Sequence, residues 1–223
     1  MINIMPRALN VTLFQLIAGH KNWGWLSEDP TPWKVLKSDG KFGLISMIAD
    51  MVNSESAVSQ TIQDIDTSMG PVFIHLEAKI GSNVRIEGPA YVESGVEIRH
   101  SAYLRPGTYL CSGCVVGHSS EVKNTIMMPS SKAPHFNYVG DSILGTGVNL
   151  GAGTKISNVR LDRGTVPIGL PGGNRIDSEL KKLGALIGDK SELGCNVVTN
   201  PGAVIAPGSA IPPNRVVTGY WSD

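Results

Sequence analysis

The sequence predicts an all-β fold, a parallel β-helix built from six-residue repeats, with a small helical cap at the N-terminus. An aliphatic residue recurs at every sixth position from Ile74 to Met128. Neither the helical period of about 3.6 residues nor the alternation of a strand produces this spacing over such a length. Gly, Pro and Asn cluster between these residues, as at 105–107 and 200–202, where turns are expected. A fixed short period of this kind is the signature of a repeat fold.

The repeated residues form a column that breaks after Met128 and again after Ile156. Its members are Ile74, Ile80, Ile86, Val92, Ile98, Leu104, Leu110, Val116, Val122, Met128, Tyr138, Leu144, Leu150, Ile156, Ile187, Leu193, Thr199, Ile205, Ile211 and Val217. Each hexad is expected to form one short strand whose large side chain points into a common core. Three hexads close a triangular coil of about eighteen residues, and coils stack at the ~4.8 Å spacing of paired strands. Because each coil is stabilised by its neighbours, the two ends of the stack need caps.

The organisation of the chain follows from where the period holds. Residues 71–223 are expected to form the β-helix, with loops at 129–137 and 158–184 where the period is interrupted. Loops that leave a rigid scaffold are where binding and catalytic residues usually lie. The two loops are therefore the first places to look for a site.

Residues 1–70 lie outside the repeat. Two stretches, 8–20 and 42–53, have the apolar spacing of helices. The same region carries three of the four tryptophans, Trp23, Trp25 and Trp33. We expect these residues to pack within a cap that covers the first coil, and the alternative is an element that docks a partner.

The composition excludes several classes of protein. Nineteen basic and nineteen acidic residues balance, so no overall field attracts nucleic acid or an anionic membrane. No apolar stretch approaches the ~20 residues needed to span a bilayer. The apolar patch from Val11 to Ala18 is interrupted by Gln15 and lacks a small-residue cleavage site, so no signal peptide is predicted. Three cysteines form no even framework, and this fits a reducing, cytoplasmic location.

Two cations are expected to stack on one outer face. Arg105 and Lys123 each follow a core aliphatic residue directly, and they are eighteen residues apart, which is one coil. Two like charges ~5 Å apart repel by roughly 1 to 3 kcal/mol, and a bridging anion would reverse that cost. Arg is well suited to phosphate. The alternative is a pair of splayed, solvated side chains.

His135 lies in the first interrupted segment, three residues before Tyr138. A loop histidine can act as a general base near neutral pH. On spacing alone, an ordinary surface histidine is the simpler interpretation.

The residues from Arg105 to Asn158 resemble a known family. They read LRPG, then GHSSEVKN, then KAPHFNYVGDSILGTGVNLGAGT. The segment is similar to the acetyltransferase half of the bifunctional glucosamine-1-phosphate N-acetyltransferase and UDP-N-acetylglucosamine pyrophosphorylase, a hexapeptide-repeat acyltransferase. That family folds as a left-handed β-helix and forms homotrimers with active sites at the seams between subunits. The resemblance covers about 72–158, is looser over 185–217, and is absent over 1–70.

The resemblance implies a role for eight residues. His135 would be the base that takes a proton from the sugar amine, which then attacks the thioester of acetyl-CoA. The substrate-binding residues would be Arg105 and Lys123, which match the cations that hold the sugar phosphate, together with Tyr138, Asn149 and Asn158. The cofactor-binding residues would be Ala152 and Cys195. Glu121 is a candidate for orienting His135.

The sequence also departs from the family. After its downstream Asn the family continues with Tyr-Asp-Gly and a substrate-gripping lysine, whereas Val-Arg-Leu-Asp-Arg-Gly follows Asn158 here. The candidates to replace that lysine are Arg160, Arg163, Lys181 and Lys182. The basic C-terminal tail and the nucleotidyltransferase half are missing from the sequence, so we expect no uridylyl transfer, and the amino sugar is left open.

Two features could be mistaken for metal sites. Cys111 and Cys114 have the spacing of half a zinc site, but Cys114 is expected to point into the core and Cys111 outward. His100 and His118 are eighteen residues apart and should stack on one face. Zinc-binding β-helix enzymes use histidines five residues apart, and Lys123 stands five after His118. We expect no metal site.

The sequence therefore predicts a cytoplasmic, homotrimeric N-acetyltransferase that uses acetyl-CoA on an amino-sugar phosphate. One alternative is a non-catalytic subunit that binds a sugar phosphate or nucleotide sugar and works with a separate nucleotidyltransferase. Another is a purely structural trimer. We expect neither nucleic acid nor a membrane as a partner.

Overall fold

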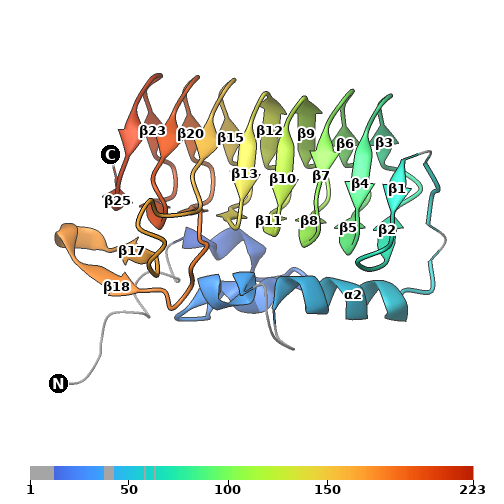
Figure 1. The fold of residues 1–223 in the computed structure, drawn as a ribbon, viewed down its shortest axis with the longest axis horizontal. Coiled ribbons are helices and arrows are strands. Elements are labelled where there is room, and N and C mark those ends of the chain that lie inside the picture. The colour runs from blue at the N-terminus through green and yellow to red at the C-terminus, as the bar shows by residue number, and fades with distance from the viewer. Residues whose placement is uncertain (1–12, 38–42, 58, 63, 223) are drawn as a thin grey trace.

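The structure, a computed structural model, describes residues 13–37, 43–57, 59–62 and 64–222. Three parallel sheets, here called A, B and C, form the sides of a prism (Figure 1). Successive coils stack along the prism, so each inner strand of these sheets lies between strands of the coils before and after it. The predicted parallel β-helix with a helix-containing N-terminal region is confirmed.

Each coil gives one short strand to each sheet. Sheet A contains β1 (Ile65–Asp66), β4 (Arg85–Glu87), β7 (Tyr103–Leu104), β10 (Glu121–Lys123), β13 (Tyr138–Gly140), β16 (Lys155–Ile156), β21 (Val198–Thr199) and β24 (Val216–Val217). Sheet B contains β2 (Val72–Ile74), β5 (Ala90–Val92), β8 (Thr108–Leu110), β11 (Thr125–Met127), β14 (Ile143–Leu144), β19 (Ala185–Ile187), β22 (Ala203–Ile205) and β25 (Tyr220–Trp221). Sheet C contains β3 (Lys79–Ile80), β6 (Glu97–Ile98), β9 (Val115–His118), β12 (Lys132–His135), β15 (Asn149–Leu150), β20 (Glu192–Leu193) and β23 (Ala210–Ile211).

The column of aliphatic residues forms the core of the prism. Ile74 pairs with Val92, and Val92 pairs with Leu110 one coil further on. All three side chains are fully buried. Like side chains thus stack directly on one another, and this stacking fixes the register of the coils.

Two coils are one residue shorter than the hexad pattern predicts. Leu110 pairs with Met127 and Met127 pairs with Leu144, in each case seventeen residues on, and Val122 likewise pairs with Val139. Met127 and Val139 therefore hold the inward positions that were predicted for Met128 and Tyr138. One missing residue lies at the corner between β10 and β11, where Asn124 has a φ of 44°, and the other at the corner between β13 and β14, where Asp141 has a φ of 49°.

The prediction of a loop over 129–137 is wrong. The chain continues through β12, which pairs with β9 and β15 and places Ala133 at the inward position. The short corner at Asn124 moves the inward residue from 134 to 133, so the segment does not match the six-residue column and the period does not reveal its strand.

The second interruption is a real excursion from the prism. After β16 the chain forms an antiparallel hairpin of β17 (Pro167–Gly169) and β18 (Arg175–Asp177), joined by the 3-10 turn η4 (Pro171–Gly173). It then returns to sheet B at β19.

The N-terminal region contains one described α-helix and three short 3-10 turns. They are η1 (Gln15–Ile17), η2 (Gly24–Ser27), η3 (Pro32–Leu36) and α2 (Leu44–Ser54). The predicted helix over 42–53 corresponds to α2. Of the predicted helix over 8–20, residues 8–12 lie outside the described residues, Leu13 is helical, and η1 follows within 14–20. Since β1 already belongs to sheet A, the β-helix begins before the predicted boundary at residue 71.

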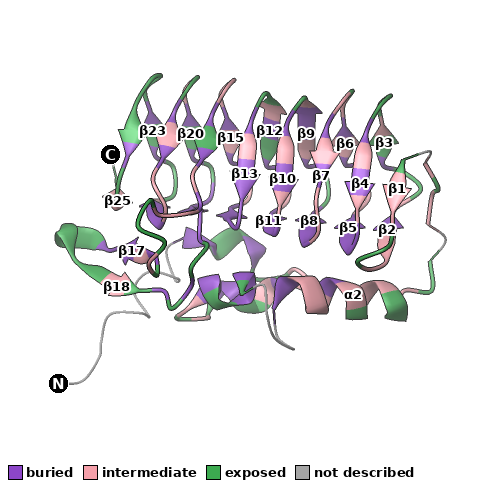
Figure 2. Cartoon of the chain, in the orientation of Figure 1, coloured by how far each residue is buried: buried purple, intermediate pink, exposed green. Residues whose placement is uncertain are grey.

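The N-terminal region lies along the side of sheet B, rather than over the first coil alone (Figure 2). The outward-facing residues of this sheet are apolar and buried. They are Phe73, Tyr91, Tyr109, Ile126, Ile143, Leu186 and Val204. The Trp23 ring packs edge-on against Tyr109 with centroids 4.9 Å apart. Trp23 and Trp33 are buried while Trp25 is exposed, so two of the three tryptophans stabilise this packing.

Within the described residues, no helix combines the length and the apolar character that crossing a membrane requires.

The stacked core predicts how substitutions should act. Leu104→Ala, at a fully buried inward position, should lower the free energy of unfolding by about 2 to 5 kcal/mol through lost burial and a cavity. Val216→Ala, where the side chain is 64% exposed, is the control and should change it little. Urea denaturation followed by circular dichroism measures both, and equal effects would contradict the assigned inward column.

Candidate active site

Arg105 and Lys123 lie at the edge where sheet A turns into sheet B, here called the A–B edge. The pairing of Leu104 with Val122 puts them at the same position of adjacent coils, as the spacing predicts. Each cation, however, has its own carboxylate partner. An Arg105 Nη1 to Glu121 Oε1 distance of 2.8 Å and a Lys123 Nζ to Asp141 Oδ2 distance of 3.0 Å define two ion pairs. Each of the two charges is therefore balanced by a carboxylate of the chain itself.

Asp141 organises this edge. Its carboxylate is 1% exposed, and it accepts hydrogen bonds from Lys123 Nζ and from the amides of Asn124 and Asn158. The Asn124 amide also donates to the Leu36 carbonyl oxygen of the N-terminal region, at 2.8 Å. Because a buried carboxylate needs such partners, Asp141 links Lys123 and Asn124 of the preceding coil to Asn158 at the start of the excursion, and Asn124 extends this network to the N-terminal region.

Tyr138 and Asn158 meet on the outer surface of sheet A. The Asn158 amide donates to Tyr138 Oη at 3.2 Å. Burial, followed by the nearby carboxylates of Asp141 and Glu121, raises the pKa of the Tyr138 hydroxyl above its usual value. The phenol therefore stays neutral and can donate a hydrogen bond to a bound molecule.

His135, Ala152 and Cys195 lie in a second column, at the edge where sheet C turns into sheet A, here called the C–A edge. His135 is exposed, and its carbonyl oxygen accepts from the Gly153 N–H at 2.9 Å, while the Ala152 carbonyl accepts from the next coil. Cys195 is exposed in that next coil. Glu121 is paired with Arg105, and no contact between Glu121 and His135 is found among the described residues.

The predicted site residues thus divide between the two edges of sheet A. Tyr138, Arg105 and Lys123 lie on or after strands of sheet A, and His135 precedes it. Asn149 starts β15 in sheet C, where its amide donates to Glu192 at 2.9 Å. One chain presents these groups as a strip across sheet A rather than as a closed pocket.

A cavity of about 520 Å³ opens beside Asp141. Its walls come from the N-terminal region, the A–B edge and the end of the excursion. The lining residues are Leu36, Lys37, Asp141, Glu179, Leu180, Lys181 and Lys182. Of the four basic residues that could replace the missing lysine, Lys181 and Lys182 lie here, whereas Arg160 is paired with Asp162. Sequence reasoning gave no role to Asp141, although it lies in the KAPHFNYVGD run that carries the resemblance, or to Lys37, which carries no periodic or motif signal.

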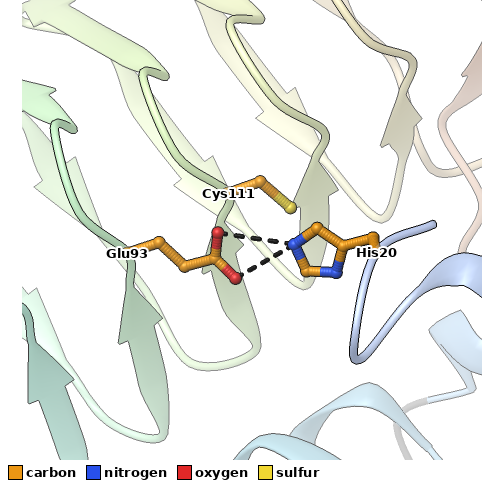
Figure 3. A group of neighbouring side chains, drawn as sticks. All are labelled: His20, Glu93 and Cys111. Atoms are coloured by element: carbon orange, nitrogen blue, oxygen red, sulfur yellow. Dashed lines mark hydrogen bonds and ion pairs between the residues drawn. The ribbon is translucent and has the colours of Figure 1, made fainter. Parts of the chain in front are cut away.

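The other histidines and cysteines have specific neighbours. The rings of His100 and His118 stack with centroids 5.1 Å apart, as predicted. Cys114 points into the core, and burial raises the pKa of its thiol to about 12. Cys111 was predicted to point outward but is fully buried, because the N-terminal region covers it and brings His20 beside it (Figure 3).

Comparison with known proteins places the chain among acetyltransferases. No family model matches the sequence. A bifunctional sugar-1-phosphate nucleotidylyltransferase/acetyltransferase of Sulfurisphaera tokodaii is 37% identical over 197 residues, covering 87% of this chain and 46% of that protein. YaiX, an uncharacterised acetyltransferase of Escherichia coli K12, is 32% identical over 163 residues, covering 71% of this chain and 70% of that protein. The chain belongs to the hexapeptide-repeat acetyltransferases.

Solved structures add little to this assignment. A hexapeptide transferase family protein from Anaplasma phagocytophilum aligns over 67% of this chain and 75% of that chain, with 15% identity. Its TM-score of 0.35 is too low to carry an argument.

Membership of the hexapeptide-repeat acetyltransferases implies acyl transfer from an acyl-CoA. The chain spans about half the length of the bifunctional relatives that it matches. Since residues 71–223 are about two thirds of the chain, an alignment over 87% of it also includes part of residues 1–70. The expectation that the resemblance is absent over 1–70 is therefore wrong. The short 3-10 turns of this region carry no repeat or motif, so the sequence alone does not reveal the similarity there.

The Asp141 network predicts a large effect of one isosteric change. Asp141→Asn leaves the mostly buried Lys123 ammonium without its partner, which costs about 3 to 5 kcal/mol for a fully buried pair and less here because Lys123 is 19% exposed. Asp162→Asn breaks an exposed ion pair in the excursion and is the control, with little expected change. Thermal unfolding measures both, and equal melting temperatures for the two variants would rule out Asp141 as the organising group.

Proposed function

We propose that the protein transfers an acetyl group from acetyl-CoA to the amine of an amino-sugar 1-phosphate. The observation that supports this most is the strip of polar groups across sheet A, in a chain that belongs to the hexapeptide-repeat acetyltransferases. The strip offers two cations at the A–B edge, a neutral phenol on the outer surface of sheet A, and an exposed imidazole at the C–A edge. These are the groups that a phosphorylated amine acceptor requires.

His135 is the proposed general base. The sugar nitrogen attacks the thioester carbon, the C–S bond breaks, and CoA leaves as a thiolate. The nitrogen can attack only with a free lone pair, so a neutral imidazole takes its proton as the C–N bond forms. Such proton transfer contributes typically about 10²- to 10⁴-fold to the rate. The imidazole then passes the proton to the leaving thiolate or to solvent.

The substrate phosphate is proposed to bind at the A–B edge. Because Arg105 and Lys123 each hold a carboxylate, an incoming phosphate must compete with Glu121 and Asp141 for them. Lys181 and Lys182 form no ion pair among the described residues and line the neighbouring cavity. The cavity volume lies within the range of small-molecule sites, so these lysines can supply the additional charge.

The active protein is proposed to be a homotrimer. In one chain, His135 and Lys123 lie at opposite edges of sheet A, whereas sheet B is covered by the N-terminal region. A closed ring of three chains packed through the uncovered sides would enclose the strip between neighbours.

Light scattering is expected to give about three times the chain mass of 23.7 kDa. A monomer at micromolar concentration would leave the strip open to water and would contradict the proposed seam.

Replacement of His135 tests the catalytic assignment. His135→Ala should lower the turnover number by about 10²- to 10⁴-fold while thermal unfolding and trimer mass stay unchanged, because the side chain is exposed. His100→Ala is the matched control, since it occupies the same column two coils away and should retain activity. CoA release with glucosamine 1-phosphate and related amino-sugar phosphates is the measurement.

One observation favours a second function. Arg105 and Lys123 already form ion pairs within the chain. This arrangement suits a non-catalytic subunit that binds a sugar phosphate or nucleotide sugar and works with a separate nucleotidyltransferase. That function predicts stabilisation by sugar phosphates without CoA release.

The test of His135 has a further outcome. Equal CoA release by His135→Ala and the unchanged protein would remove His135 from the mechanism but keep the transferase.

A further inference from the structure

Three side chains with different metal-binding atoms meet at the edge where sheet B turns into sheet C (Figure 3). Glu93 follows β5 and Cys111 follows β8, at the same position of adjacent coils. His20 reaches them from the segment between η1 and η2. One nitrogen, one carboxylate oxygen and one sulfur all lie within 4.8 Å of one another.

We propose that His20, Glu93 and Cys111 bind a divalent transition-metal ion of the zinc class. Imidazole nitrogen, carboxylate oxygen and thiolate sulfur are the ligands of Zn²⁺ in proteins, at about 2.0 to 2.3 Å. The sulfur favours Zn²⁺ or Co²⁺ over Mg²⁺ and Ca²⁺, which take oxygen ligands. A distance of 4.8 Å between ligand atoms needs to shorten by about 1 Å to surround one ion, and this is within the reach of rotating side chains.

The coil register and the N-terminal region hold the three groups in place. Val92 pairs with Leu110, so Glu93 and Cys111 stand one strand spacing apart. Cys111 is fully buried, and the side chains of His20 and Glu93 are each 13% exposed. A cluster fixed in this way loses little conformational entropy when an ion binds.

Outer contacts orient the carboxylate. Tyr109 Oη donates to Glu93 Oε1 at 2.6 Å, and the Ser112 N–H donates to Glu93 Oε2 at 2.9 Å. The Asn22 amide in turn donates to Tyr109 Oη at 2.7 Å. Outer partners of this kind commonly hold metal ligands in position.

The proton balance shows what an ion must displace. The N–H groups of Asn22 and Trp23 both approach His20 Nδ1 at 3.3 Å. The imidazole proton therefore sits on Nε2, which is 3.1 Å from Glu93 Oε1. An ion on Nε2 requires that this proton move to Nδ1, and Cys111 gives its thiol proton to solvent. Since the two N–H groups oppose a proton on Nδ1, the turn at 20–23 must loosen, and this lowers the affinity.

The cluster is open on one side. A cavity of about 500 Å³ reaches His20 and Glu93, and His75 and Ser112 also line it. A water molecule or a small ligand can therefore complete the coordination from the cavity, as in zinc sites with three protein ligands.

Cobalt titration tests the proposal in a Cys195→Ser background, which removes the exposed thiol. We expect one Co²⁺ per chain, with the near-ultraviolet absorption of a cobalt–thiolate bond. Cys111→Ser should abolish this absorption. Cys114→Ser is the matched control, because Cys114 is equally buried but its sulfur contacts the Met127 and Met128 carbonyls instead, and it should keep the absorption.

Glu93→Gln provides a second variant if Cys111→Ser fails to fold. It should weaken Co²⁺ binding by at least about tenfold, and the rise in melting temperature with Zn²⁺ should shrink accordingly. No absorption in the Cys195→Ser protein, or the same absorption after Cys111→Ser, would overturn the proposal. Because neither readout uses CoA, failure here leaves the proposed acetyl transfer untouched.

Discussion

The register of the coils is the constraint on which the rest of the structure depends. One aliphatic side chain per strand stacks on its counterpart in the next coil, and slipping a strand by one residue would turn these side chains out of the core. Residues one coil apart are therefore held about 4.8 Å from each other wherever they face outward. The Arg105–Lys123 pair, the stacked rings of His100 and His118, and the Glu93–Cys111 pair all arise in this way.

Stacking also places like charges close to one another on the outer surface. Two cations in one column repel, and the structure resolves this by pairing each of them with a carboxylate of sheet A or of the next coil. Asp141 is the strongest case, because it is buried and lies at the second short corner, between β13 and β14. A substrate phosphate at this edge would have to exchange partners with existing ion pairs, so binding there should depend on how easily the Asp141 network rearranges.

The period alone predicted the sheets, the stacking of distant residues and the excursion after Ile156. It could not predict the short corners at Asn124 and Asp141, because a missing residue moves the inward position without changing the composition of the segment. The sequence does contain a signal for the cover over sheet B. Phe73, Tyr91 and Tyr109 are apolar residues directly before the core positions, so they face outward and need to be covered. The joining of His20 to Cys111 needed the structure, because no spacing relates a non-repeating segment to a coil.

The cover over sheet B limits how chains can assemble. With that side occupied by the N-terminal region and the hairpin, a neighbouring chain can reach sheets A and C and the C–A edge between them. This edge carries His135 and Cys195, whereas Lys123 lies at the far edge of sheet A beside the N-terminal region. If the proposed trimer forms, the imidazole comes from the side that meets a neighbour, while the phosphate end is enclosed by segments of the chain's own fold. The N-terminal region then shapes the acceptor end of the site as well as covering the core.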